Sequence, residues 1–157
     1  MPTSALPFAV RHLKCSAGVV ITASHNLKQY NGYKVYGADG CKITLNVVRK
    51  IQSEIEKVDE FDDVRIMNFK GAFEDKLINY IDKDVISAFL LEVNSQAINK
   101  NIENKKNLKI VYTPLNGTGL TCVTSSLKQS GYTNINIVAS QKLPDGNFPT
   151  CPYPKIS

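Results

Sequence analysis

Hydrophobic positions in the first third of the chain alternate between helical spacing and short apolar runs. Residues 3–13 carry apolar side chains three and four positions apart, which predicts a short helix. The β-branched apolar run 17–22 is too short for a helix, so we predict a buried strand there. An Asn-Gly turn signal, in which both residues tolerate positive φ, precedes an alternating second strand at 33–36. Helical spacing returns over 45–58 and predicts an amphipathic helix.

The middle of the chain keeps a helical period for longer than one ordinary helix. Apolar positions recur at helical spacing from 73 to about 98, and charged residues interrupt the pattern near 82–84. The pattern predicts either one long helix or two shorter ones, and it leaves both alternatives open.

The last third has the pattern of a crossover unit. A strand over 108–113, a Gly-containing turn, a helix over 120–130 and a strand over 134–138 form a βαβ unit, whose strands run parallel. Prolines in residues 140–157 predict an extended loop. The predicted fold class is therefore α/β, a mixed sheet with helices, divided into residues 1–103 and 104–157.

Composition narrows the class of protein. The chain has 157 residues, 43% hydrophobic and 21% charged, which excludes a disordered or low-complexity protein. Its longest apolar run, 17–21, is far shorter than the roughly 20 residues that a membrane span needs. The four cysteines are widely spaced, as expected of free thiols in a reducing compartment. We expect a cytoplasmic protein that does not bind a membrane.

The net charge of +5 comes from the two ends of the chain, which flank an acidic middle. There is neither a cluster of Lys and Arg nor the interleaved aromatic residues of many nucleic-acid-binding proteins. The excess of positive charge fits a small anionic ligand as well as it fits a nucleic acid. We expect no nucleic-acid partner.

Candidate chemistry lies directly after the predicted strand 17–22. The sequence Thr22-Ala23-Ser24-His25-Asn26 leaves the strand in a polar loop, where a serine can act as a nucleophile if its deprotonation is assisted. Loops of this composition are more often plain turns, in which the Asn side chain bonds to the backbone. The loop by itself leaves both interpretations open.

Longer stretches around the loop favour the nucleophile. Residues 17–26 (AGVVITASHN) and 30–37 (YNGYKVYG) closely resemble the active-site serine loop of the α-D-phosphohexomutase superfamily, in particular the phosphoglucomutase and phosphomannomutase-like enzymes. Residues 111–119 (VYTPLNGTG) resemble the opening of that family's second domain, and residues 144–150 (PDGNFPT) resemble a loop further into it. The chain thus resembles the end of a first domain and the opening βαβ unit of a second.

The resemblance implies an isomerase that acts as an intramolecular phosphotransferase. Ser24 would carry a phosphoryl group, donate it to a sugar monophosphate and recover the other phosphoryl group from the bisphosphate intermediate, so that sugar 1-phosphate and 6-phosphate interconvert. Mg²⁺ would contact the phosphate on Ser24, and glucose 1,6-bisphosphate would be the activator. Lys34 corresponds to the family's general acid/base lysine, and His25 would flank the phosphoserine. Thr22 and Asn26 would shape the phosphate loop.

Ordinary structural roles remain as alternatives for these residues. Ser24 could be a turn serine, Lys34 a solvated strand lysine, and His25 a residue that holds the loop by hydrogen bonding. The sequence also departs from the family: Leu27 replaces the usual proline, Asn116 stands where histidine is frequent, and the final residues 155–157 replace the usual Asn-Pro-Glu.

The family has four domains, whereas this chain corresponds to parts of two. We therefore expect the isolated chain to be incomplete and inactive, with a sugar phosphate as substrate and the missing domains of the parent enzyme as partners. The alternative is a non-catalytic remnant or anion-binding module that retains the serine loop. Within the family, phosphoglucomutase, phosphomannomutase and phosphopentomutase activities all remain open.

Overall fold

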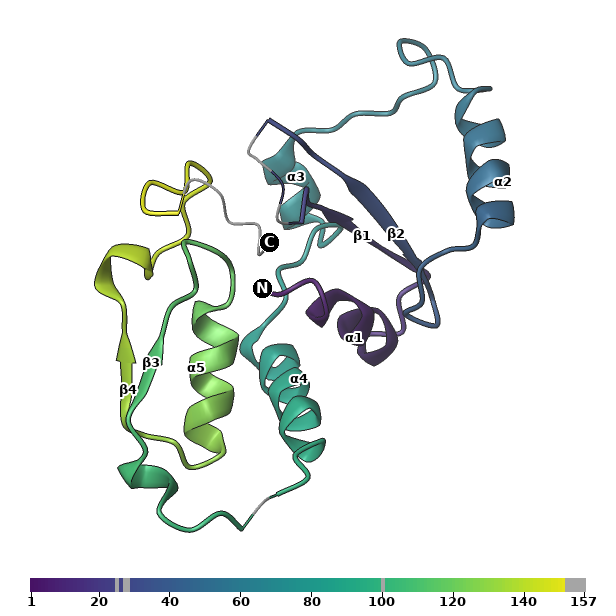
Figure 1. Ribbon diagram of the computed structural model, residues 1–157. Helices are drawn as coiled ribbons and strands as arrows, with labels where there is room; N and C mark the ends of the chain where they lie inside the picture. The colour runs from purple at the N-terminus through teal and green to yellow at the C-terminus, as the bar shows by residue number, and fades with distance from the viewer. Residues whose placement is uncertain (25, 27–28, 100, 152–157) are drawn as a thin grey trace.

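The computed structural model describes residues 1–24, 26, 29–99 and 101–151, which form an α/β protein with two small sheets (Figure 1). The predicted fold class is confirmed, with the strands divided between two separate sheets. The elements, in chain order, are α1 (Ala5–His12), β1 (Ala17–Ile21), β2 (Tyr33–Gly37), α2 (Leu45–Ile55), α3 (Phe69–Glu74), α4 (Lys83–Ser95), the 3₁₀ turn η1 (Lys105–Asn107), β3 (Ile110–Tyr112), α5 (Leu120–Gln129), β4 (Ile135–Ile137) and the 3₁₀ turn η2 (Ala139–Gln141).

The first sheet pairs β1 with β2 in antiparallel register, with Ala17 opposite Gly37 and Ile21 opposite Tyr33. Helix α1 packs on β1 across Gly18, where any side chain would crowd Val10, since an added Cβ would stand 2.5 Å from the Val10 Cγ2. Gly18 therefore allows the helix to approach the strand closely.

The second sheet confirms the predicted crossover unit. β3 and β4 run parallel, with Ile110 opposite Ile135, and α5 connects them. A tight turn reverses the chain direction and so joins antiparallel strands. Two neighbouring parallel strands therefore need a longer crossover connection such as α5.

Helix α4 joins the two halves through a small apolar core. It contacts both α1 and α5, and a buried cluster gathers Ala5, Phe89, Leu90 and Cys122. The rings of Phe8 and Phe89 lie 5.5 Å apart. This packing brings the start of the chain between the two sheets, as Figure 1 shows.

The predicted helical stretch 73–98 is mostly replaced by one helix, α4, and only the last two residues of α3 fall within it, so neither one long helix nor two helices across the stretch is correct. Helix α3 ends at Glu74, and α4 begins only after Asp82. The Asp82 carboxylate accepts hydrogen bonds from the N–H groups of Asp84 and Val85 at 3.0 and 3.1 Å. This N-cap fixes the start of α4, and residues 75–82 are not helical.

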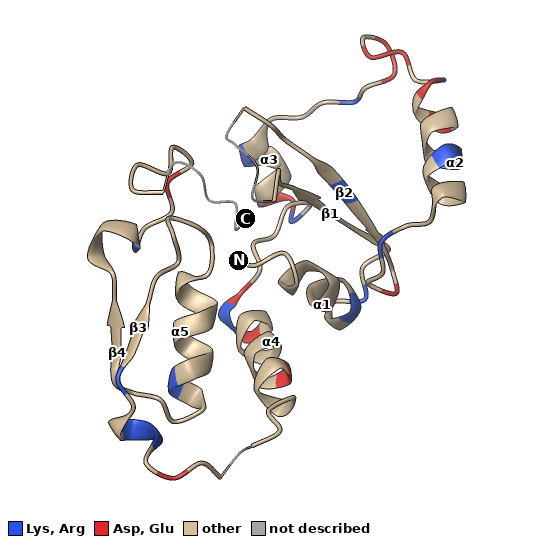
Figure 2. Ribbon diagram, viewed as in Figure 1, with Lys and Arg blue, Asp and Glu red and all other residues tan. Residues whose placement is uncertain are grey.

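Helix α2 is amphipathic as predicted but ends at Ile55, and none of its residues is buried. It lies to one side of the first sheet and is separated from β2 by a groove (Figure 1). Figure 2 shows that acidic residues gather at its end and on the following loop. In the described part of the chain, no helix combines the length and apolar character needed to cross a membrane.

Candidate active site

Ser24 lies on an exposed turn just beyond the end of β1. Its backbone has a φ of 61°, in the left-handed region that non-glycine residues rarely adopt. The Ser24 N–H donates a hydrogen bond to Thr22 Oγ1 at 3.0 Å, and the Asn26 N–H donates to the Ala23 carbonyl at 3.1 Å. The Thr22 hydroxyl thus helps to hold Ser24 in a conformation that costs about 1–2 kcal/mol.

Thr22 is itself held by the hairpin. Its N–H donates to the Gly32 carbonyl at 2.8 Å, and the Asn31 side chain accepts from the Gly32 N–H at 2.9 Å. An added Cβ on Gly32 would stand 2.5 Å from the Thr22 carbonyl oxygen. The Asn-Gly turn signal predicts a positive φ at Gly32, but Gly32 is not among the described residues that have one. Glycine is required here because the backbone of Thr22 lies too close for a side chain.

Ser24 lines a cleft of about 660 Å³, a volume within the range of small-molecule binding sites. The cleft lies between the serine turn and two loops of the second half of the chain. Its lining includes Thr3, Ile21, Thr22 and Ser24 on one side, and Pro114, Leu115, Asn116, Gly117, Thr118, Pro144, Asp145, Gly146 and Phe148 on the other. Residues from both sides of the predicted domain boundary therefore line the same cleft.

The far wall contains a second left-handed turn. Leu115 and Asn116 have φ values of 51° and 56°, and the Leu115 N–H donates to Thr113 Oγ1 at 3.1 Å. The Thr113 hydroxyl in turn donates to the Gln141 side chain at 2.6 Å. Sequence reasoning interpreted residues 116–119 as a tight turn, but it did not identify Asn116 or Asp145 as part of the site.

The turn before α5 is also closed tightly against β3. An added Cβ on Gly119 would stand 2.5 Å from the Tyr112 hydroxyl oxygen. Burial raises the pKa of Tyr112 above its ordinary value, and the neighbouring Cys122 raises this pKa further.

The predicted site residues do not all meet in the cleft. Ser24 and Thr22 line it, and Asn26 is exposed on the same turn. Lys34 lies in β2 opposite Val20 and lines a different groove of about 380 Å³ between β2 and α2. His25 lies outside the described residues, as do Leu27 and the final positions 155–157.

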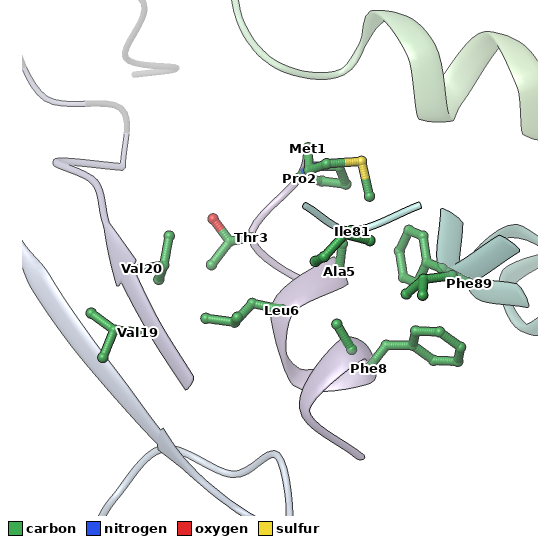
Figure 3. A pocket seen from close by; sticks show the side chains of 12 residues that line it. Met1, Pro2, Thr3, Ala5, Leu6, Phe8, Val19, Val20, Ile81 and Phe89 are labelled. Carbon is green, nitrogen blue, oxygen red and sulfur yellow. The ribbon is translucent and has the colours of Figure 1, made fainter. Parts of the chain in front are cut away.

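A second, smaller hollow is chemically different from the cleft. It measures about 180 Å³ and lies between α1, β1 and the start of α4 (Figure 3). Leu6, Phe8, Val20 and Phe89 surround it, and Thr3 is the sole polar residue among the described residues that line it. Such a surface suits apolar packing, so the cleft beside Ser24 is the better candidate for a charged ligand.

The described residues do not by themselves supply a complete set of ligands for Mg²⁺. None of them form a group of three or more His, Cys, Asp or Glu side chains able to hold a metal ion. Asp145 supplies the carboxylate along the cleft, and its Oδ1 already accepts from the Asn147 N–H at 2.8 Å. Magnesium prefers several oxygen ligands in octahedral geometry, so no step proposed below passes through a metal.

Comparison with known proteins supports the pattern found in the sequence. Sequence models of two domains of one family match the chain: "Phosphoglucomutase/phosphomannomutase, alpha/beta/alpha domain I" over residues 1–62, and domain II of the same family over residues 87–157. The second match begins inside α4, and the boundary near residue 103 stays a prediction.

Three curated relatives carry three different names. The chain is 34% identical to a phosphoglucomutase of Staphylococcus saprophyticus and 32% identical to a phosphomannomutase of Mycoplasmoides pirum, each over 94% of this chain. It is also 32% identical to a human phosphopentomutase over 98% of this chain. It spans only about a quarter of their length, 26%, 26% and 25% respectively.

A solved structure supports the fold. A crystal structure described as that of a phosphomannomutase from Thermus thermophilus matches 94% of this chain and 30% of its own length. The TM-score is 0.59 at 23% sequence identity, which shows a shared fold.

Proposed function

The chain belongs to the phosphoglucomutase and phosphomannomutase family, and from that membership we propose that Ser24 is the residue that carries a phosphoryl group. The parent reaction would interconvert a sugar 1-phosphate and a sugar 6-phosphate. This chain would supply the serine turn and part of the cleft, and the remaining length of the parent protein would complete the site.

The proposed transfer needs positioning more than covalent assistance from the protein. A hydroxyl of the sugar monophosphate would attack the phosphorus on Ser24, and the bond between that phosphorus and Ser24 Oγ would break. The sugar hydroxyl would lose its proton and Ser24 Oγ would gain one. The bisphosphate would then return its other phosphoryl group to Ser24 by the reverse step.

The observation that carries the proposal is the backbone of Ser24. A serine in the left-handed region, held by the Thr22 hydroxyl and lining a cleft of ligand size, is expected where a side chain must be presented precisely. Left-handed residues also occur at ordinary helix ends of this chain, such as Lys14 and Lys76, so it is the combination of this backbone with the cleft that supports the role of Ser24.

Lys34 is the proposed general acid/base. It lies two residues beyond Gly32, whose carbonyl accepts the Thr22 N–H bond, so its strand is tied directly to the serine turn. The resemblance supplies the role, and His25 would flank the phosphoserine on the same basis.

Labelling of the full-length parent protein that contains these 157 residues tests the proposal. Glucose 1,6-bisphosphate carrying labelled phosphate is incubated with the parent protein, and its peptides are then analysed for bound label. We expect label on the peptide that contains Ser24, no label in Ser24→Ala, and unchanged labelling in Ser16→Ala, which alters another exposed serine. Label on a different residue, or equal labelling of Ser24→Ala, would refute the role of Ser24. Bisphosphate that binds but transfers nothing would favour an anion-binding module.

A further inference from the structure

A buried asparagine joins two loops of the wall that faces Ser24. Asn116 is 6% exposed and is the buried polar residue of the described part of the chain. Its N–H donates to the Gln141 carbonyl at 2.9 Å, and its own carbonyl accepts from the Asp145 N–H at 2.9 Å. The left-handed turn is therefore bonded through its backbone to a segment 25 to 29 positions further along the chain.

The side chain of Asn116 bonds to the same segment. Its Nδ2 donates to the Leu143 carbonyl at 3.0 Å and, over 3.5 Å, to the Ser140 carbonyl. Its Oδ1 accepts from the Thr150 hydroxyl at 3.1 Å. Because a buried polar group without a partner is costly, these bonds strongly favour one arrangement of the loop 139–150.

The residues held in this way form the cleft wall. Leu115, Gly117, Asp145 and Phe148 line the cleft, with Ser24 on the other side. We propose that Asn116 is a positioning residue that fixes the two loops of this wall relative to each other. The inference rests on the proposed function in one respect: the wall matters for phosphoryl transfer only if Ser24 carries the phosphoryl group.

Asparagine is suited to this position for two reasons. It tolerates the left-handed backbone better than most residues, and its amide offers donors and an acceptor together. Asn116→Gly keeps the backbone conformation without strain and removes only the side-chain bonds. Asn104 provides a matched control, because it is also left-handed, with a φ of 58°, but is exposed.

Amide hydrogen exchange separates local positioning from general stability. In Asn116→Gly we expect the amides of Asp145 and Phe148 to exchange about tenfold faster or more, because the side-chain bonds that order their loop are lost. The amides of Ile110 and Val138, which bond to the neighbouring strands, should change less than about twofold. Equal acceleration at all four amides, or at none, would overturn the proposal. Asn104→Gly should change none of them.

Phosphoryl transfer supplies the second readout. In the parent protein with labelled glucose 1,6-bisphosphate, Asn116→Gly should raise the half-saturating concentration about fivefold or more and leave the maximal labelling rate within about twofold, since the wall holds the ligand and does not react. Loss of maximal rate with unchanged half-saturation would contradict this role.

The two readouts fail differently. If the unaltered parent protein takes no label, the proposed function fails, and hydrogen exchange still decides whether Asn116 fixes the wall. If labelling succeeds and Asn116→Gly behaves like Asn104→Gly in both measurements, the inference about Asn116 fails and the proposed function stands.

Discussion

The two left-handed turns across the cleft are built in opposite ways. The turn at Ser24 is exposed and is held by bonds to residues close along the chain, chiefly Thr22. The turn at Asn116 is buried and is held by bonds to residues 24 to 34 positions away. A residue proposed to meet substrate must be accessible, whereas the wall opposite it gains from burial. The comparison shows how one cleft combines a reachable side chain with a firm surface.

The contrast has an energetic consequence. A single exposed hydrogen bond contributes about 0.5–1.5 kcal/mol, whereas a buried polar group left without its partner costs about 1–3 kcal/mol. Substitutions at the Asn116 turn should therefore affect the stability of the whole chain more than substitutions at the Ser24 turn. The latter should act mainly on the conformation of Ser24.

The largest effect is expected for Asn116→Leu. It leaves the Leu143 carbonyl and the Thr150 hydroxyl without their partner and should lower the free energy of unfolding by about 2–4 kcal/mol in urea denaturation. Asn104→Leu introduces the same left-handed strain at an exposed site, so the difference between the two variants measures the buried bonds. Equal losses would show that strain alone, and not the bonds, distinguishes the Asn116 turn.

Gly32→Ala should have the next largest effect. The new Cβ would stand 2.5 Å from the Thr22 carbonyl oxygen, and relief of such overpacking costs about 1–3 kcal/mol. Gly146→Ala is the control, because an added Cβ there meets nothing within 4 Å. If urea denaturation gave the same midpoint for both variants, the hairpin would not hold the serine turn as closely as we describe.

Thr22→Val tests the bond to Ser24 directly. It keeps the shape of the side chain but removes the acceptor, so we expect a loss of about 0.5–1.5 kcal/mol. The Ser24 backbone chemical shifts in NMR spectra should also move away from left-handed values. Thr22→Ser keeps the hydroxyl and should restore those shifts. Left-handed shifts that persist in Thr22→Val would mean that Thr22 does not position Ser24.

The smallest effect is expected for Tyr112→Phe, and it concerns the free energy of unfolding at alkaline pH. Burial raises the pKa of Tyr112 in the folded chain, so the folded state holds this proton more tightly than the unfolded state does. The resulting stability is fully present below the ordinary pKa of tyrosine, near 10, and is lost as the pH rises through the raised folded value. Tyr112→Phe should therefore show a shallower alkaline decline in unfolding free energy. An identical decline would exclude Tyr112 as its source.

Local patterns were sufficient to predict most of the fold. The strand 17–22 and the crossover unit from 108 to 138 follow from spacing within a few residues, and the structure confirms them as β1 and as β3, α5 and β4. The predicted burial of the first strand is wrong: α1 packs on β1 at Gly18, but Val19 and Ile21 are 44% and 57% exposed. The prediction of helix at residues 75–82 is wrong. Apolar spacing does not reveal where a helix is capped, and the Asp82 carboxylate caps α4 so that the helix begins after residue 82. The amphipathic pattern of α2 predicts a buried face, and none of its residues is buried.

The candidate site also contains residues that the sequence predicted and residues that it did not. Ser24 and Thr22 were predicted from a contiguous motif, and both line the cleft. The role of Asn116 could not be predicted, because its partners lie on a loop with no sequence signal that marks them as partners. Whether Lys34 reaches a cleft depends on strand pairing and on the packing of α2, and in this structure it lines a separate groove.

The most direct test of the central claim is whether Ser24 carries phosphate. The protein is isolated from the cells that produce it, without phosphatase treatment, and its peptides are weighed by mass spectrometry. We predict that the peptide containing Ser24 is heavier by one phosphate and that fragmentation assigns this phosphate to Ser24, with none on Thr22. Phosphate on another residue, or a Ser24 peptide that remains unmodified even after exposure to glucose 1,6-bisphosphate, would contradict the account.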